Sequence, residues 1–352
     1  MILNIVYSPD EAHKSTQLMH GMISSVFREN GLPVFDFFMV EGQLSSTFDV
    51  QFPVITTSKI AKKKGIWKYV PSGLTSKLCG LVDSHKARFV VCDGLGVARQ
   101  MFPVLKKNPE LKLVVVVHAV ARFKQKDLKN FIRYSDRVKL VLVSSSLANE
   151  IYNCYPVLRK QSSIIPNTLS SGFVNNLLPK SEARELLGLP SQSKLYVVAS
   201  RLSVKKDVAT VVRAYARLPA ENSYLVIMGE GPCRSDLECL VIDLGIKDRV
   251  IWLGWVKNSS LYLKAFDVFV SASKTEGFGL SVFEARAAGL AVVCTDIVPH
   301  KEVLEEEGIY FNVGDAVGCA NELLKVSSLA NSWDLAVKYQ QFSTAYLKII
   351  NE

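Results

Sequence analysis

The sequence lacks the patterns that would indicate a disulfide framework, a zinc site or a membrane span. Its seven cysteines are an odd number, scattered with no C-x-x-C pair, so the sequence indicates buried reduced thiols. No run approaches the roughly 20 apolar residues that a spanning helix needs. The opening apolar residues 2–7 are too few for a signal peptide. We therefore expect a cytoplasmic protein or one that lies at the inner face of the cell membrane.

Length and composition favour two α/β domains. The chain has 352 residues, which is too long for one average domain, and 49% of them are apolar. Apolar runs alternate with helix-like stretches, which predicts a doubly wound parallel sheet in each half. The runs lie at 2–7, 34–40, 88–92, 113–117 and 138–143 in the first half, and at 195–199, 224–228, 250–253, 268–271 and 291–294 in the second.

Residues 275–285 couple two carboxylates to a glycine turn. Glu276 precedes the turn at Gly277 and Gly279, and Glu284 follows in a predicted helix over 280–288. Glycines leave backbone N–H groups uncovered at the start of that helix, where an anion such as a phosphate binds. This pattern suits a nucleotide sugar. A glycine-punctuated strand-to-helix connection with two solvated glutamates is the alternative.

A second segment, residues 199–207, carries two cations between a strand and a helix. Arg201 and Lys206 flank this loop after the apolar run 195–198. Two cations placed in this way can clamp a diphosphate. The alternative is a pair of solvated surface cations.

Together the two segments resemble the C-terminal half of the family 4 retaining glycosyltransferases of the bacterial group 1 type. The family's run of Gly, Arg, Leu, three variable residues and Lys is matched by Arg201, Leu202 and Lys206, although Ser200 replaces the Gly. Its Glu-Gly-Phe-Gly-Leu run with a second Glu is matched throughout 276–284. The segments 165–167 and 229–232 are also typical of the family.

The resemblance implies the GT-B fold, in which two Rossmann-like doubly wound domains face a central cleft. It implies an acceptor-binding domain formed by residues 1–167 plus 334–352, where the last segment is a helix that crosses back, and a donor-binding domain over 168–333.

The resemblance also implies roles for individual residues. Arg201, Lys206 and the N–H groups around the glycine turn would hold the diphosphate, Glu276 would bind sugar hydroxyls, and Glu284 would bind ribose hydroxyls. His118 follows the strand 113–117 and would contact the donor sugar, unless a loop carbonyl merely satisfies it. The catalytic set is Glu276, His118, Arg201 and Lys206; the donor-binding set is Arg201, Lys206, Gly229, Gly277, Phe278, Gly279, Leu280 and Glu284.

The activity that the resemblance implies is retaining transfer of a sugar from a nucleoside diphosphate sugar, with UDP preferred, to a glycan or glycolipid in cell-envelope or lipopolysaccharide synthesis. No Asp-x-Asp motif is present, so we predict no metal and no cofactor beyond the donor. The loop 8–15 lacks the family's Gly-Gly pair, so its backbone cannot approach the donor phosphates and the acceptor as closely. A sugar-nucleotide epimerase, a glycan phosphorylase and a non-catalytic nucleotide-sugar-binding partner protein stay open as alternatives.

Positive charge is concentrated in the first half. Residues 1–167 contain 23 basic and 12 acidic residues, a net +11, whereas the remainder has a net −2. Basic residues over Lys59–Lys68 interleave with aromatic and aliphatic ones, and a second cluster surrounds Phe123. Such stretches can lie on an anionic bilayer, or can be solvated loops. No nucleic-acid-binding module is recognisable, so nucleic acid is not an expected partner.

Overall fold

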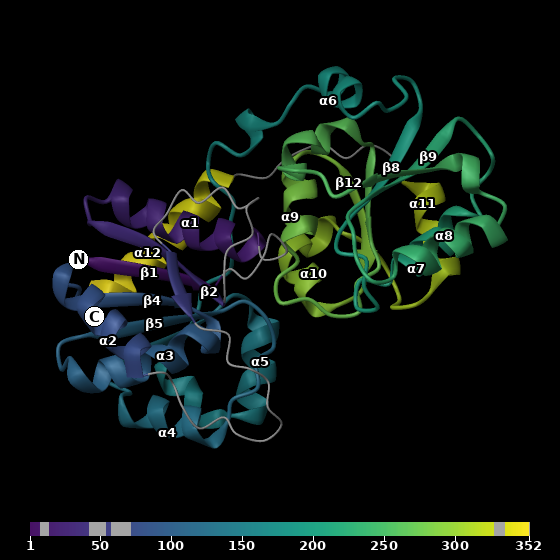
Figure 1. Ribbon diagram of the computed structural model, residues 1–352. Helices are drawn as coiled ribbons and strands as arrows, with labels where there is room; N and C mark the ends of the chain where they lie inside the picture. Colours follow the sequence, from purple (N-terminus) through teal and green to yellow (C-terminus); the bar gives the residue numbers. More distant parts are fainter. Residues whose placement is uncertain (8–13, 42–53, 58–71, 327–334, 352) are drawn as a thin grey trace. The chain divides into compact units, whose positions relative to one another are not determined.

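The computed structural model describes residues 1–7, 14–41, 54–57, 72–326 and 335–351. The chain divides into two compact units. The first contains Met1–Thr168 and Lys338–Glu352, and the second contains Leu169–Val337. Each is a parallel sheet with helices on both faces (Figure 1).

The first unit is built on a seven-stranded parallel sheet of order β3-β2-β1-β4-β5-β6-β7. Helix α1 contacts β1 and β2, while α3 contacts β4 and β5 and packs on α2. Figure 1 shows α1 and α12 on one face of the sheet and α2 and α3 on the other. The elements are β1 (Ile2–Tyr7), α1 (Lys14–Glu29), β2 (Val34–Glu41), β3 (Val54–Thr57), α2 (Ser72–Ser84), β4 (Phe89–Asp93), α3 (Gly94–Lys107), β5 (Lys112–Val117), α4 (Gln125–Arg133), β6 (Val138–Leu142), α5 (Ser145–Cys154), β7 (Ser162–Ile164) and α12 (Leu335–Asn351).

The second unit is built on a six-stranded parallel sheet of order β10-β9-β8-β11-β12-β13. Helices α9 and α10 cover one face, and α7, α8 and α11 cover the other (Figure 1). The elements are α6 (Lys180–Leu186), β8 (Lys194–Ala199), α7 (Val208–Tyr215), β9 (Ser223–Met228), α8 (Arg234–Asp243), β10 (Val250–Gly254), β11 (Val268–Ser271), α9 (Leu280–Ala287), β12 (Ala291–Thr295), α10 (Val298–Leu304), β13 (Ile309–Phe311) and α11 (Ala316–Lys325).

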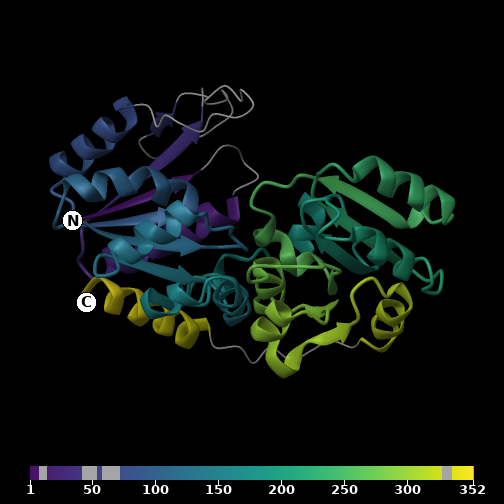
Figure 2. The same ribbon diagram turned by 90° about the horizontal axis from the view of Figure 1, so that it is seen from below.

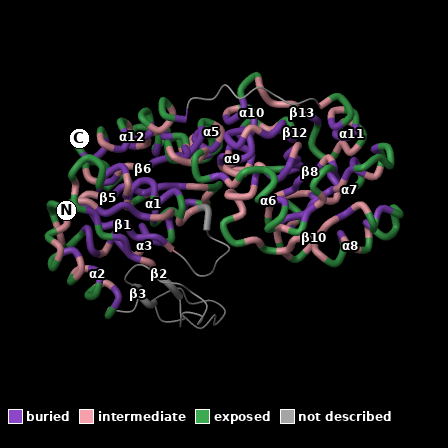
Figure 3. The backbone as a smooth tube through the Cα atoms, turned by 90° about the horizontal axis from the view of Figure 1, so that it is seen from above, coloured by how far each residue is buried: buried purple, intermediate pink, exposed green. Residues whose placement is uncertain are grey.

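The apolar runs predict the central strands because parallel strands are buried on both faces. The Val114–Val117 part of β5 and all of β12 are buried, and Figure 3 shows the central strands of both units as buried. All ten predicted runs are strands, so the α/β prediction is confirmed. Three short strands, β3, β7 and β13, are additional. Of these, β7 has the sequence Ser-Ser-Ile and β13 has only three residues, so neither stands out as an apolar run.

The C-terminal helix α12 packs on helix α1 of the first unit. The rings of Phe27 and Tyr346 meet edge to face at 6.3 Å, and Tyr339 donates a hydrogen bond to Glu29 at 2.8 Å. Phe342 is also buried. Figure 2 shows this helix beside the strands of the first unit. The last residues of the chain therefore complete the core of the unit that contains the first residues.

Candidate functional site

The two motif segments follow neighbouring strands of the second sheet. Strands β8 and β11 pair in parallel, with Val268 opposite Tyr196 and Phe269 opposite Val197. Strand β9 lies on the other side of β8, so the strand order reverses between β8 and β11. Ligands of doubly wound sheets bind beyond the carboxyl ends of the strands at this point of reversal. The loops 200–207 and 272–279 both begin there.

The structure brings two predicted site residues into direct contact. The Lys206 ammonium donates a hydrogen bond to the Glu276 carboxylate across the two loops. Both side chains are half-buried, with exposed fractions of 25% and 14%. The backbones of the loops are also joined, since the Lys274 N–H donates to the Lys205 carbonyl at 2.8 Å. The cation and the carboxylate therefore occupy one site.

Arg201 lies on the same loop as Lys206 but is exposed. Within the described part of the chain, the structure records no hydrogen bond or ion pair for its guanidinium. Arg201 is therefore available to a ligand, but the structure does not itself join it to the glycine turn. Its role in a diphosphate clamp stays a prediction.

The glycine turn caps the N-terminus of α9. Gly279 has φ +95°, a left-handed conformation that glycine adopts without strain, and its carbonyl accepts the first helical hydrogen bond from Phe283 at 3.0 Å. The first backbone N–H groups of a helix have no acceptor within the helix, and they carry its positive partial charge. Gly277 is half-buried just before this end, and Leu280 begins the helix. The turn thus presents backbone donors beside Lys206.

The Phe278 side chain packs against helix α9. Its ring is buried and meets Phe283 edge to face at 5.8 Å. The side chain thus anchors the turn on the body of α9, and any donor contact of Phe278 stays a prediction.

Gly229 allows two loops to pack in direct backbone contact. A Cβ at Gly229 would overlap the Ser200 carbonyl, and one at Gly231 would overlap the Leu202 carbonyl. The Leu202 N–H donates to the Glu230 carbonyl at 2.9 Å, which holds the loop after β9 beneath the Arg201 loop. The sequence predicts that Gly229 binds the donor; the structure gives it a positioning role, and the donor contact is untested.

Glu284 lies on the second turn of α9 and is half-buried. Burial raises the pKa of its carboxyl group to about 7, because desolvation disfavours the charged form. At neutral pH the group is therefore divided between its acid and its carboxylate.

His300 is a site residue that sequence reasoning missed. It is buried in α10, and a Cβ on Gly279 would lie 3.2 Å from its Cδ2 atom. Its Nδ1 donates to the Thr295 carbonyl at 2.9 Å. Burial lowers the pKa of His300, although the nearby Glu276 opposes that shift. In the sequence, only the position of His300 shortly after strand β12 points to the site, and this is a weaker indication than a motif.

His118 lies in the first unit, directly after β5. It is half-buried, and its ring lies 5.3 Å from the buried ring of His20. Its Nε2 has no hydrogen-bond partner in the described residues. Contact of His118 with the donor sugar stays a prediction. Burial lowers the pKa of His118 to about 4.

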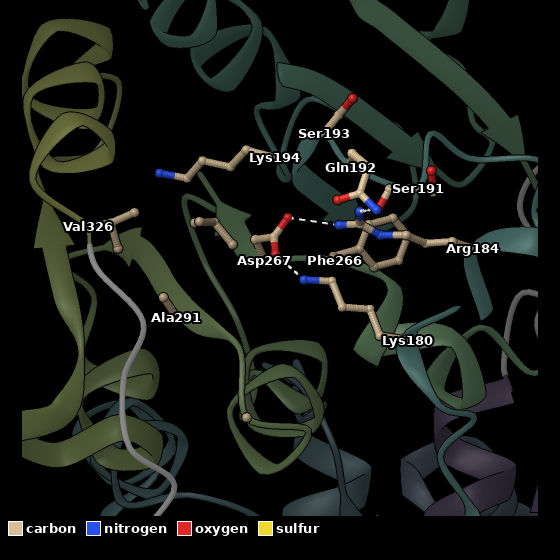
Figure 4. Close-up of a pocket in the computed structure, with 12 residues that line it drawn as sticks. Lys180, Arg184, Ser191, Gln192, Ser193, Lys194, Phe266, Asp267, Ala291 and Val326 are labelled. Carbon is tan, nitrogen blue, oxygen red and sulfur yellow. Dashed lines mark hydrogen bonds and ion pairs between the residues drawn. The ribbon is translucent and has the colours of Figure 1, made fainter. Parts of the chain in front are cut away.

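A cavity of about 740 Å³ lies at the opposite end of the second sheet, lined by the first residues of β8, β11 and β12 (Figure 4). Asp267 at its wall is paired with Lys180 at 2.5 Å and with Arg184 at 3.0 Å. Because ligands of such sheets bind beyond the carboxyl ends of the strands, this cavity is separate from the predicted donor site.

Two sequence predictions on the first unit have different outcomes. The basic segment Lys59–Lys68 and the first-loop residues 8–13 lie outside the described residues. The second basic cluster was expected to place Phe123 at a bilayer surface. Phe123 is instead buried against Phe131 and Tyr155, so its ring does not serve as a membrane anchor. Among the described residues, no helix combines the length and apolar character needed to cross a bilayer.

Proteins similar to this chain, in sequence or in fold, include glycosyltransferases. Residues 179–337, inside the second unit, match the family described as Glycosyl transferases group 1. Across 99% of the chain the fold is that of HepE of Anabaena in complex with UDP, with a TM-score of 0.76 and 17% identity, covering 98% of that structure. The GT-B prediction is thereby confirmed.

Two curated relatives match part of the chain. The lipopolysaccharide core biosynthesis glycosyltransferase LpsE of Rhizobium meliloti is 32% identical over 41% of the chain. The alpha-monoglucosyldiacylglycerol synthase of Streptococcus pneumoniae is 28% identical over 58% of the chain. The matches span 42% and 48% of these relatives, which is less than half of their length.

Proposed function

We propose that the protein is a glycosyltransferase that moves a sugar from a nucleoside diphosphate sugar to a glycan or glycolipid acceptor. The observation that carries this proposal is the contact of Lys206 with Glu276 beside the glycine-capped start of α9. An ammonium group has three donors, so Lys206 can hold the carboxylate and a phosphate oxygen together.

The chemistry follows from where charge develops. Breaking the bond from the sugar to the diphosphate leaves negative charge on the phosphate and oxocarbenium character on the sugar, and stabilisation must reach both. Lys206, Arg201 and the backbone N–H groups at the start of α9 stabilise the leaving diphosphate. Glu276 accepts hydrogen bonds from sugar hydroxyls. Glu284 accepts them from the ribose, which favours its carboxylate form.

The donor and acceptor classes are part of the proposal. UDP is the preferred nucleotide, supported by the resemblance and by the fold shared with a UDP-bound protein. A lipid-linked or cell-envelope acceptor is supported by the relatives, one of which takes part in lipopolysaccharide core synthesis and another of which makes a glycolipid. We also propose retention of anomeric configuration and a reaction without a divalent ion.

The test combines binding with turnover. Purified protein is melted with UDP-, GDP- and ADP-sugars, and the true donor should raise the melting temperature because it binds only the folded state. That donor is then incubated with glycolipid extracts, with and without EDTA, and the anomeric configuration of the product is read by NMR. Transfer with retention in EDTA is expected.

The other outcomes separate the alternatives. Conversion of the sugar nucleotide without an acceptor indicates an epimerase, and a requirement for inorganic phosphate indicates a phosphorylase. Binding without any product indicates a non-catalytic partner protein. Inversion of configuration, or strict dependence on Mg²⁺, would contradict the retaining and metal-independent parts of the proposal.

A further inference from the structure

Three side chains of types that can ligate a metal lie close together in the first unit. His20 from α1, Asp93 at the end of β4 and His118 after β5 have ligand atoms that all lie within 4.8 Å of one another. Strands β4 and β5 are neighbours in the sheet (Figure 1). We refer to these three residues as the His-Asp-His cluster.

Hydrogen bonds fix which nitrogen of His20 faces the cluster. The Asn4 amide nitrogen donates to Asp36 at 2.7 Å and to Ser24 at 2.9 Å, so the Asn4 amide oxygen is the atom 2.7 Å from His20 Nδ1. That oxygen accepts only, so Nδ1 carries the proton and Nε2 carries a lone pair. A metal-ligating histidine is oriented in this way, through a hydrogen bond from its other nitrogen.

The Nε2 atoms of the two histidines are buried without partners in the described residues. His20 is fully buried, and neither its Nε2 nor that of His118 has a hydrogen-bond partner in the described part of the chain. A buried polar atom without a partner is costly, so a ligand at this place is favoured.

Asp93 adds an anionic oxygen donor. Its carboxylate accepts a hydrogen bond from the Tyr7 N–H at 3.1 Å, which holds it at the edge of the sheet. Asp93 and His118 are half-buried, so an ion can reach the cluster from solvent.

We propose that the His-Asp-His cluster binds one divalent transition-metal ion of the Zn²⁺ class. Two imidazole nitrogens and a carboxylate suit Zn²⁺, Co²⁺ or Ni²⁺, whereas Mg²⁺ and Ca²⁺ prefer sites made of oxygen. Ligands about 2.1 Å from a tetrahedral ion lie about 3.4 Å apart. The separations within the cluster, up to 4.8 Å, therefore shorten by at most about 1.4 Å on binding, a change that rotation of the half-buried His118 and Asp93 side chains can supply.

The bound ion has two consequences. It ties α1 to the carboxyl ends of β4 and β5, so it raises the melting temperature. It also occupies His118, so it inhibits transfer if that histidine contacts the donor. The second consequence rests on the proposed function, while metal binding itself does not.

The test measures metal binding directly. The EDTA-treated full chain is titrated with Co²⁺ and followed by visible absorption, and with Zn²⁺ by calorimetry. All proteins carry Cys154→Ser and Cys239→Ser, because these two exposed thiols would also bind Zn²⁺. One ion per chain is expected, with the visible spectrum of a low-coordinate Co²⁺ site.

Variants locate the site. His118→Gln and Asp93→Asn should each weaken Co²⁺ binding by about 10-fold or more, with circular dichroism confirming that both fold. His85→Gln is the control, since His85 belongs to the same unit but not to the cluster, and it should bind Co²⁺ as the parent does. A parent protein that binds Co²⁺ no better than His118→Gln overturns the site. If His118→Gln loses transfer but keeps full metal affinity, the metal site is wrong while the proposed function stands.

Discussion

The two units share a strand order at their centres but differ in the connections that follow equivalent strands. In the first unit β4 runs directly into α3, because Asp93 ends the strand and Gly94 begins the helix. In the second unit β11 ends at Ser271, and residues 272–279 intervene before α9. That longer connection contains Glu276 and the glycine turn, so the proposed donor contacts of the second unit lie on a loop rather than on the sheet.

The side chains beyond the carboxyl ends of the strands also differ between the two sheets. The second unit presents a cation, a carboxylate and backbone N–H groups, which suit a diphosphate. The first presents two neutral imidazoles and a carboxylate, which suit a metal ion or a sugar hydroxyl. One sheet topology thus supports two kinds of ligand, and the side chains decide between them.

The largest effect should come from the cation of the second unit. Lys206→Ala removes the charge that, in the proposed function, stabilises the leaving diphosphate, so kcat/KM for sugar transfer should fall about 100-fold. The neighbouring Lys205→Ala is the matched control, because Lys205 is exposed and its recorded loop contact uses only its backbone carbonyl. Steady-state kinetics with the identified donor measures kcat/KM for both variants. If Lys206→Ala and Lys205→Ala had equal kcat/KM values, the Lys206 ammonium would not contribute to sugar transfer.

The backbone contact below the Arg201 loop should give the next largest effect. Gly229→Ala places a Cβ against the Ser200 carbonyl, which forces a shift of backbone. We expect the free energy of unfolding to fall by about 2–3 kcal/mol, together with a loss of donor affinity.

Gly80→Ala is the control for that substitution. Gly80 lies in helix α2 of the first unit, and an alanine Cβ there would meet nothing within 4 Å, so the substitution should stabilise the protein by about 0.5–1 kcal/mol. Denaturant unfolding of both variants measures the difference. A Gly229→Ala protein as stable as the parent would show that the two loops are not in rigid contact.

Much of this arrangement can be predicted from the sequence, and the failures have physical causes. The apolar runs identify the central strands because burial on both faces demands them, whereas β7, with the sequence Ser-Ser-Ile, carries no such signal. Lys206 and Glu276 can be predicted for one site because their loops follow strands of one sheet. His300 and His20 were missed, since each is positioned by tertiary contacts rather than by a motif.

The pH dependence of stability should distinguish the second unit through Glu284. Its pKa of about 7 in the folded protein exceeds the ordinary value of 4.5, so folding favours the protonated form. The wild-type protein should therefore lose stability as pH rises from about 4.5 to 7 through this group. Glu284→Gln removes that loss. It should raise the free energy of unfolding by about 1–2 kcal/mol above pH 7, less than the full pKa shift implies because solvent screens the half-buried carboxyl group, and by little below pH 4.5. Melting curves at several pH values test this. A gain that is the same at all pH values would point to packing instead of charge.

The smallest effect concerns Asp207, which follows Lys206 and directly precedes α7. Asp207 has φ +46°, and its carboxylate accepts a hydrogen bond from Thr210 at 3.0 Å. Aspartate tolerates this left-handed conformation better than alanine does, and glycine adopts it freely. Asp207→Ala should therefore lower the free energy of unfolding by about 1–2 kcal/mol.

Asp207→Gly should stay within about 1 kcal/mol of wild type, because the relief of backbone strain offsets the lost hydrogen bond. Thermal melts of the two variants, measured side by side, isolate the backbone contribution. If alanine and glycine prove equally stable, the loop does not require a left-handed residue after Lys206, and the contacts of the Asp207 carboxylate with Thr210 and Lys274 explain the aspartate.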